Sequence, residues 1–249
     1  KSEEIARRSS QVPLLDEPYM PETPKMPNDP PDNWPIFHLF HPDKDLGAPY
    51  DPNSAIHYKG RYHLHYIYRN RAGISYAHVS STDMVRWKWH PTVLVPQVNR
   101  HGMFSGTAFI TKDGTPAHAY CGWGSNRNWI QHALDDNLDK WSEPVVMIPR
   151  HDTGKLMVNE PYFDPDVWIM DGFYYGLNGR SSHQSPLIMK SENLKDWEHI
   201  GELLHPDFDE EKLGVKKEED ISCPNFFKLG DKWVLTCISH RLGCRYFIG

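Results

Sequence analysis

GAPYDPNSAIHYKGRYHLHYIYRN, residues 47–70, is the stretch that decides the fold. Apolar or aromatic residues alternate with polar ones on both sides of a Lys59-Gly60 pair, which is typical of a β-hairpin. Asp51, followed by Pro52, stands at the entrance of the first strand. An Asp before Pro is most often a turn residue. The rest of the chain repeats this arrangement, however, and the repetition favours a functional role for Asp51.

The hairpin and its opening motif occur four times in the sequence. The four openings are Tyr50-Asp51-Pro52, Phe104-Ser105-Gly106, Phe163-Asp164-Pro165 and Ser222-Cys223-Pro224. Each of the first three is followed by a polar turn and a tryptophan, and these tryptophans are Trp87, Trp141 and Trp197. A strand-only repeat of roughly 55 residues is typical of a β-propeller with four strands per blade. The sequence therefore predicts an all-β propeller, with the three tryptophans packed inside the blades.

The openings also predict where a site would form. In a propeller the first strand of each blade lines the central channel, so Asp51, Ser105, Asp164 and Ser222 are expected to converge at one mouth, with Asp51 and Asp164 within ~10 Å, two strand spacings. No repeated tryptophan follows the fourth opening. Because missing blades would leave sheet edges exposed, we expect the chain to supply about four blades of a longer protein.

Composition excludes several other classes of protein. The chain has 249 residues, a net charge of −6 and no cluster of Lys or Arg, so a nucleic-acid partner is not expected. No apolar run is long enough to span a bilayer. The proline-rich residues 1–33 predict an extended arm ahead of a propeller domain over residues 34–249. The four cysteines have no metal-binding spacing and leave the compartment open, with secretion slightly favoured.

From Trp34 to Gly249 the motifs resemble, in order, those of glycoside hydrolase family 32, the invertases, inulinases and levanases. The matching blocks are Asp51-Pro52-Asn53, SYAHVSSTDMVRWKWHP (residues 75–91), Phe104-Ser105-Gly106-Thr107-Ala108, Phe163-Asp164-Pro165 and Ser222-Cys223-Pro224-Asn225-Phe226. The resemblance implies a five-bladed propeller that hydrolyses fructosides without a cofactor. It also implies that Asp51 is the nucleophile and that Asp164 stabilises the transition state. A further C-terminal blade, and a β-sandwich domain beyond it, would complete such a protein.

Three departures from the family pattern concern substrate binding and the general acid. Tyr50 stands for the family's Asn, Phe163 for its Arg and Ser222 for the Glu that acts as general acid and base. The first two changes remove hydrogen-bond donors to a fructosyl ring. The third removes the proton donor, because a serine hydroxyl has no suitable pKa.

Two nearby carboxylates are candidates for the missing acid. A retaining glycosidase needs two carboxyl groups about 5–5.5 Å apart. Asp220 lies two residues before Ser222, so strand alternation places it on the same face. Glu219 would point the other way unless a β-bulge intervenes. Both candidates stay open, and either one needs burial to raise its pKa.

Other side chains are candidates for binding a sugar rather than for catalysis. Aromatic rings can stack on sugar faces, and polar groups at the same mouth can bind hydroxyls. The expected substrate-binding residues are Tyr50, Asn53, Phe104, Ser105, Trp123, Phe163 and Ser222. No metal site is expected, because His63 and His65 share a strand face without a third histidine or a carboxylate at a suitable spacing.

Two alternatives to a fructosidase remain. Ser222 in place of the acid is compatible with a carbohydrate-binding propeller that has lost hydrolysis. A five-bladed glycosidase of the arabinanase or xylosidase type would have inverting geometry, with carboxyls about 6.5–9.5 Å apart.

Overall fold

The computed structural model describes residues 23, 32–33, 38–41, 47–159, 161–180 and 185–249. Nearly all of the predicted arm, residues 1–33, lies outside the described residues, and so does Trp34, where the propeller domain was predicted to begin. The chain divides into two compact units. The first comprises residues 1–104, 122–125 and 131–144, and the second comprises 105–121, 126–130 and 145–249.

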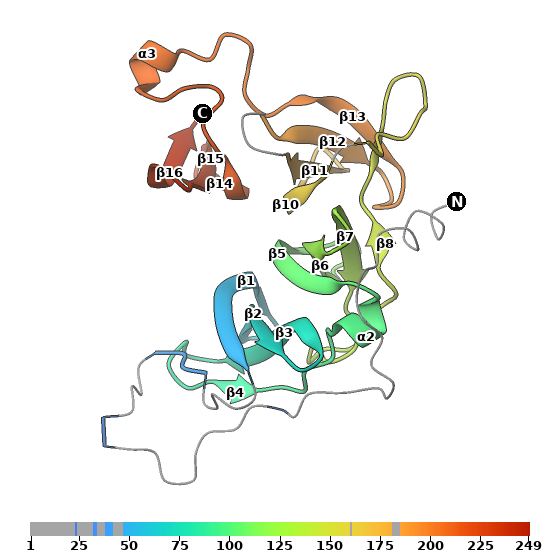
Figure 1. Ribbon diagram of the computed structural model, residues 1–249, viewed down its shortest axis with the longest axis vertical. Coiled ribbons are helices and arrows are strands. Elements are labelled where there is room, and N and C mark those ends of the chain that lie inside the picture. Colours follow the sequence, from blue (N-terminus) through green and yellow to red (C-terminus); the bar gives the residue numbers. More distant parts are fainter. Residues whose placement is uncertain (1–22, 24–31, 34–37, 42–46, 160, 181–184) are drawn as a thin grey trace. The chain divides into compact units, whose positions relative to one another are not determined.

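The first sheet grows from the hairpin of residues 47–70. Its strands are β1 (Ala48–Tyr58), β2 (Arg61–Asn70), β3 (Gly73–Ser81) and β4 (Lys88–Trp89), paired in chain order and antiparallel (Figure 1). Lys59 and Gly60 join β1 to β2 with φ values of 45° and 77°, as a two-residue turn between twisted strands requires. The predicted hairpin is thus confirmed.

Three more sheets follow in the chain, and their strands pair in nearly the same order. The second sheet contains β5 (Gly102–Ile110), β6 (Pro116–Trp123), β7 (Arg127–His132) and β8 (Val145–Val146). The third contains β10 (Phe163–Met170), β11 (Phe173–Gly179), β12 (Leu187–Ser191) and β13 (Trp197–Glu202), with β9 (Pro149–Arg150) parallel to β13 at its edge. The fourth contains β14 (Ser222–Leu229), β15 (Lys232–Ser239) and β16 (Gly243–Ile248). Two four-residue helices, α2 (Pro96–Asn99) and α3 (Glu210–Leu213), lie between strands.

The tryptophan segments repeat in backbone geometry as well as in sequence. Met84, Leu138 and Leu194 each stand three residues before a repeated tryptophan, and their φ values are 57°, 58° and 63°. The indole N–H of Trp141 donates to the Leu138 carbonyl at 3.0 Å, and that of Trp197 donates to Leu194 at 3.3 Å. The sequence repeat is therefore a structural repeat.

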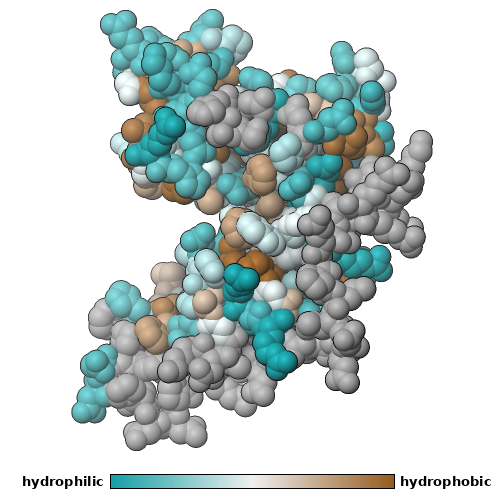
Figure 2. All heavy atoms as spheres, in the orientation of Figure 1, coloured by the Kyte–Doolittle hydropathy of each residue, from teal (hydrophilic) through white to brown (hydrophobic). Residues whose placement is uncertain are grey.

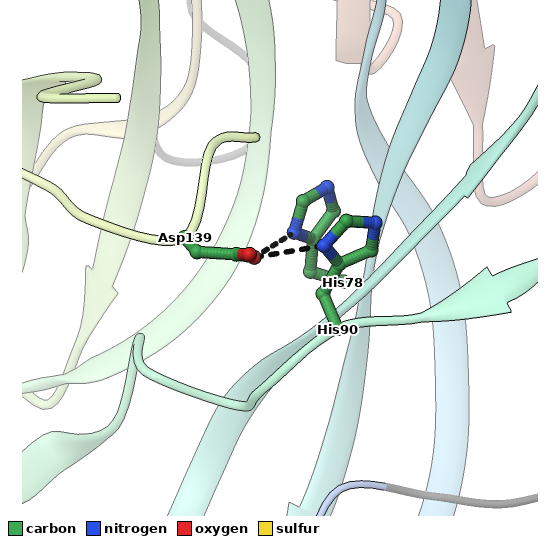
Figure 3. A group of neighbouring side chains, drawn as sticks. All are labelled: His78, His90 and Asp139. Carbon is green, nitrogen blue, oxygen red and sulfur yellow. Dashed lines mark hydrogen bonds and ion pairs between the residues drawn. The ribbon is translucent and has the colours of Figure 1, made fainter. Parts of the chain in front are cut away.

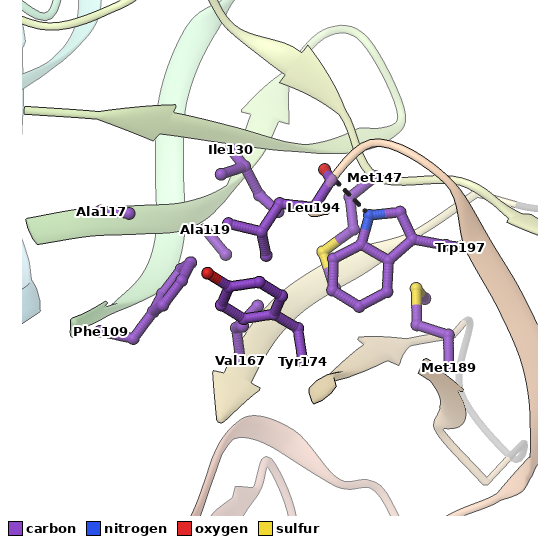
Figure 4. Packing of buried hydrophobic residues seen from close by; sticks show 10 residues of the cluster. All are labelled: Phe109, Ala117, Ala119, Ile130, Met147, Val167, Tyr174, Met189, Leu194 and Trp197. Atoms are coloured by element: carbon purple, nitrogen blue, oxygen red, sulfur yellow. Dashed lines mark hydrogen bonds between the residues drawn. The ribbon is translucent and has the colours of Figure 1, made fainter. Parts of the chain in front are cut away.

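Trp197 belongs to the hydrophobic core of the second unit. Its side chain is 1% exposed. Gly176 makes room for it, since a Cβ there would lie 2.3 Å from Met147 and 2.8 Å from the Trp197 ring. Figure 4 shows the cluster, which comprises Phe109, Ala117, Ala119, Ile130, Met147, Val167, Tyr174, Met189, Leu194 and Trp197. Trp87 packs against a core cluster of the first unit, while Trp141 is half-buried.

The fourth sheet has three strands, one fewer than the first two sheets. This agrees with the missing fourth tryptophan segment. Hydrophobic side chains lie at the surface over β14–β16 (Figure 2), and they include Leu229, Tyr246 and Ile248, which are 60–70% exposed. Among the described residues, no helix has the length and apolar character needed to cross a membrane.

Candidate functional site

The four opening motifs occupy equivalent places in their sheets. They lie in β1, β5, β10 and β14, and each of these strands is the first in its sheet and stands at one end of the pairing order. The pairing register shifts at three of them, between Pro49 and Pro52, between Phe163 and Asp166, and between Ser222 and Asn225. A β-bulge at this place changes the direction in which the neighbouring side chains point.

Asp164 and Cys223 adopt a backbone conformation that is rare for residues other than glycine. Their φ values are 43° and 46°, and each precedes a proline. Such conformations cost of order 1–3 kcal/mol and concentrate at functional sites. The two equivalent positions thus share a bulge and a strained backbone, which marks both openings as candidates for function.

Two carboxylates on β10 hold the opening of β14. Asp164 Oδ2 accepts a hydrogen bond from the Cys223 backbone N–H at 2.9 Å, and Asp166 Oδ2 accepts one from the Phe226 N–H at 2.6 Å. The Cys223 thiol lies 4.0 Å from the hydroxyl of Ser105 on β5. The second, third and fourth openings therefore meet within one compact unit, as the sequence predicted.

Burial raises the pKa of both carboxyl groups. The pKa of Asp164 is raised by burial, against hydrogen bonds from Cys223 and Ser105, and the charge of Asp220 adds to the increase. Burial raises the pKa of Asp166 to about 6, although Phe226, Thr107 and Val167 donate hydrogen bonds to it. Sequence reasoning missed Asp166. It could have been found as a second acidic residue two positions after Asp164 on the same strand, where alternation would place both side chains on one face.

Asp220 stands before β14 in a loop, yet its side chain meets Ser222 as expected. The Ser222 hydroxyl donates to Asp220 Oδ1 at 2.8 Å, and His240 Nδ1 lies 2.5 Å from Asp220 Oδ2. Partial burial raises the pKa of Asp220, but the hydrogen bonds from His240 and Ser222 outweigh it and the net shift is downward. Asp220 is therefore stabilised as a carboxylate.

Glu219 faces a different partner. Its carboxylate accepts a hydrogen bond from the Ser239 hydroxyl at 2.5 Å, and that bond lowers its pKa, as do the charges of Arg245 and Arg241. The side chains of Glu219 and Asp220 thus bind neighbouring residues of the same hairpin end, Ser239 and His240.

Asp51 lies within β1, in the first compact unit. It is exposed at the bulge, and the Asn53 side-chain amide donates to its backbone carbonyl at 3.0 Å. Asp51 is therefore part of a strand rather than of the hairpin turn, which is formed by Lys59 and Gly60. Its predicted approach to Asp164, which belongs to the second unit, stays a prediction.

The aromatic candidates divide between the two units. In the first unit, the rings of Phe104 and Trp123 lie 4.8 Å apart, Trp123 is 53% exposed and Tyr50 on β1 is 51% exposed. In the second unit, Phe163 is half-buried, and its carbonyl accepts a hydrogen bond from Asn128 at 3.1 Å. Trp123 and Tyr50 thus have large exposed surfaces.

The histidines of the first unit gather around one carboxylate, contrary to the prediction that they would lack one. His78 Nδ1 and His90 Nδ1 lie 3.3 Å and 2.9 Å from the same oxygen of Asp139 (Figure 3). His63 Nδ1 lies 3.0 Å from His78 Nε2. The expectation was wrong because Asp139 is far away in the sequence and is brought in by the fold.

This cluster has the composition of a metal site but the geometry of a hydrogen-bond network. The ligand atoms of His78, His90 and Asp139 lie within 4.8 Å of one another. However, both Nδ1 atoms lie within hydrogen-bond distance of the same Asp139 oxygen, at 3.3 Å and 2.9 Å, which suits two N–H donors on one acceptor.

One set of tautomers satisfies every contact of the network. His78 and His90 donate from Nδ1 to Asp139, His63 donates to His78 Nε2, and the Ser80 hydroxyl donates to His90 Nε2 at 2.7 Å while accepting from Arg61. Burial lowers the pKa of His63 and His78 to about 4. Burial opposes ionisation of Asp139, but the two imidazoles offset it and lower its pKa.

Residues 40–246 match the model of the glycosyl hydrolases family 32 N-terminal domain. The chain is 28% identical over 222 residues to a sucrose-6-phosphate hydrolase of Salmonella typhimurium, covering 81% of the chain and 44% of that enzyme. It is 31% identical over 224 residues to a sucrose-6-phosphate hydrolase of Zymomonas mobilis, covering 79% and 41%. The chain thus spans less than half the length of the curated relatives that it matches.

Solved structures show the same fold. Fructan 1-exohydrolase IIa from Cichorium intybus superposes with a TM-score of 0.66 at 21% identity, covering 87% of the chain and 44% of that structure. Similarity at this level concerns the fold alone. The predicted five-bladed propeller, of which this chain provides about the first four blades, is confirmed.

Proposed function

Because the chain belongs to glycosyl hydrolase family 32, we propose that it hydrolyses β-fructofuranosides with retention of configuration. The observation that carries the proposal is the meeting of the third and fourth openings, where Asp164 binds the Cys223 N–H. These are the two places that match the family's second and third catalytic blocks. The relatives' names, sucrose-6-phosphate hydrolase and raffinose invertase, suggest sucrose and related oligosaccharides as substrates.

The match to the family gives Asp51 and Asp164 their roles. Asp51 attacks the anomeric carbon while the bond to the leaving oxygen breaks, and it forms a fructosyl ester. Asp164 accepts hydrogen bonds from sugar hydroxyls, and these strengthen as positive charge develops on the ring. Water then attacks the ester and releases fructose. Two positions where the family has Asn and Arg are aromatic here, Tyr50 and Phe163, so stacking on the sugar takes over part of the binding.

The test is fructose release by the purified protein and by an Asp51→Asn variant. We expect the wild type to hydrolyse sucrose or a fructan, and the variant to lose several orders of magnitude in rate while keeping its melting temperature. Asp171→Asn is the matched control, because Asp171 is an exposed turn residue with φ of 50°, a conformation that Asn tolerates. Substantial turnover by Asp51→Asn would exclude the nucleophile role.

A second candidate function is carbohydrate binding without hydrolysis. It is favoured by Ser222, which stands where the family has its acid. In that case titration calorimetry would detect binding of sucrose or fructans, while neither protein would release fructose.

A further inference from the structure

His240 stands at the end of the fourth sheet, on the turn between β15 and β16. Its side chain is 76% exposed. Its Nδ1 lies 2.5 Å from Asp220 Oδ2, and its backbone N–H donates to the same oxygen at 3.1 Å. Asp220 thus binds both the ring and the backbone of His240. This leaves Nε2 as the ring nitrogen that can meet an incoming group.

The turn that carries His240 is held in place from several sides. The Ser239 hydroxyl accepts hydrogen bonds from the N–H groups of Arg241 and Leu242 at 3.1 Å and 3.0 Å, and it donates to Glu219. Arg245 donates to the backbone carbonyl of Asp220. A ring on such a pinned turn loses little freedom when it binds a substrate, which is a requirement of an effective catalytic group.

His240 also lies beside the residues that occupy the family's acid block. Asp220 links it to Ser222 through a 2.8 Å hydrogen bond from the Ser222 hydroxyl. The hydrogen bond from His240 to Asp220 is the main cause of the raised pKa of His240, and the charges of Asp220 and Asp164 add to it. The Asp164 carboxylate is thus close enough for its charge to favour the protonated imidazole.

The two neighbouring carboxyls are poorly placed to donate a proton themselves. Both oxygens of Asp220 are engaged, Oδ1 by Ser222 and Oδ2 by His240. Glu219 is bound by Ser239. Both groups have lowered pKa values, which favour the ionised forms. The imidazole is the group in this cluster whose pKa is shifted towards the protonated form.

We propose that His240 is the general acid and base of the hydrolysis, donating from Nε2, and that Asp220 is the positioning residue that orients its ring. This inference rests on the proposed function. In the first step the Nε2 proton passes to the glycosidic oxygen as its bond to the anomeric carbon breaks and the bond to Asp51 forms. In the second step neutral His240 takes a proton from water as the water oxygen bonds to the anomeric carbon, which frees the Asp51 carboxylate.

The charged and titratable groups around His240 decide the expected pH profile. Asp220 and Asp164 are the acidic groups that favour the imidazolium. Glu219, Arg241 and Arg245 lie beside the same turn, and their charges partly cancel. Hydrolysis should therefore fall as pH rises through a value above 6.5, the ordinary pKa of histidine, where the donor loses its proton.

The experiment compares the wild type with His240→Gln on two substrates, sucrose and 4-nitrophenyl β-D-fructofuranoside. General acid catalysis contributes about 10²–10⁴-fold. We expect a loss in that range in kcat/KM on sucrose, with a loss in kcat/KM below roughly tenfold on the aryl substrate, whose leaving group departs without a proton. The basic limb of the pH–rate profile should disappear for sucrose. Asp220→Asn should also slow sucrose hydrolysis more than hydrolysis of the aryl substrate, but by a smaller factor. It should shift the basic limb of the pH–rate profile to lower pH.

Two controls separate catalysis from folding. His205→Gln removes another exposed histidine paired with an aspartate, since His205 lies 3.6 Å from Asp207, and it should leave both rates unchanged. Asp207→Asn, which changes the partner of that control histidine, should also leave both rates unchanged. The imidazole signals in NMR provide a second measurement, because the His240 pKa should lie above 6.5 in the wild type and fall in Asp220→Asn.

The outcomes distinguish this inference from the proposed function. If the wild type releases no fructose from any fructoside, the proposed function fails and the acid role fails with it. If the wild type is active and folded His240→Gln keeps its sucrose rate or its basic limb, only the acid role is overturned. An equal loss in kcat/KM on both substrates would likewise overturn it, because a structural defect has no leaving-group preference.

Discussion

The two histidine–carboxylate clusters of this protein carry the same pair of groups, but the pKa values of His78 and His240 shift in opposite directions. In the first unit, His78 is 3% exposed beside Asp139, and burial lowers its pKa to about 4. In the second unit, His240 is 76% exposed beside Asp220, and the pair raises its pKa. Each of the two rings has its own carboxylate partner, so the partner does not explain why the pKa values shift in opposite directions. Burial does, because it penalises the charged imidazole.

This difference teaches which cluster stabilises the fold and which can do chemistry. A buried neutral ring whose hydrogen bonds are all satisfied helps to fix the packing of the core, and it cannot reach a substrate. A histidine–carboxylate pair at the surface contributes little stability, since exposed ion pairs are screened by water. Changes in the first cluster should therefore affect folding, and changes in the second should affect activity. The following predictions test that division.

The largest effect on stability is expected from Asp139→Ala. The change leaves the Nδ1 donors of His78 and His90 without their shared acceptor, and unsatisfied buried donors cost about 3 kcal/mol in total. Urea denaturation measures the loss. Asp136→Ala is the control from the same segment, because its pair with Lys59 is exposed and its removal should leave the midpoint unchanged. Equal losses in the two variants would contradict the network.

The next effect is a loss of stability in acid. His63 and His78 have folded pKa values of about 4 against 6.5 for free histidine. The unfolded chain thus binds more protons between these values, and their contribution is complete above pH 6.5 and is lost as pH falls towards 4. Melting temperatures between pH 7.5 and 4.5 should show a steeper fall in the wild type than in His78→Asn. Asp166, whose raised pKa acts in the opposite direction, is common to both proteins and cancels in the difference.

A smaller effect is expected from Ser80→Ala. The Ser80 hydroxyl links Arg61 to His90, and its loss removes one donor and one acceptor from the buried network. We expect a destabilisation of about 1–2 kcal/mol. Ser80→Cys keeps the size and part of the hydrogen bonding, so it should recover part of the loss. If Ser80→Ala costs as much as Asp139→Ala, the network is not centred on the carboxylate.

The smallest effect on stability is expected from Asp220→Ala, which breaks the exposed pair. It should lower the free energy of unfolding by less than about 1 kcal/mol, while hydrolysis of sucrose falls far more than hydrolysis of an aryl fructoside. Added salt should make this small loss of stability smaller still, because it screens an exposed ion pair. A destabilisation comparable to that of Asp139→Ala would show that both clusters serve the fold.

Local patterns predicted much of the fold. The alternation around Lys59-Gly60 and the repeated openings identified the hairpins, and the tryptophan segments identified the blades, because these signals come from residues that are neighbours in sequence. The candidate residues on the openings were found in the same way. Asp220 was expected on the same strand face as Ser222; it lies in a loop before the strand, and a hydrogen bond from the Ser222 hydroxyl joins the two side chains.

The residues that sequence reasoning missed depend on contacts between distant segments. Asp139 reaches His78 across 61 positions, and Asp220 reaches His240 across 20. Neither pairing has a characteristic spacing, because the loops between the partners vary freely in length. Asp166 was overlooked because its bond to the Phe226 N–H exists only where β10 lies against β14.

The sequence by itself determined the strands, the repeat, the family and the position where the family's acid is replaced by Ser222, since all of these are properties of residue order. Tertiary structure alone decided which charges meet. It placed burial around one histidine cluster and solvent around the other, and so lowered the pKa of His78 and raised that of His240. The physical reason is that a pKa depends on surroundings contributed by the whole fold, and no local pattern contains them.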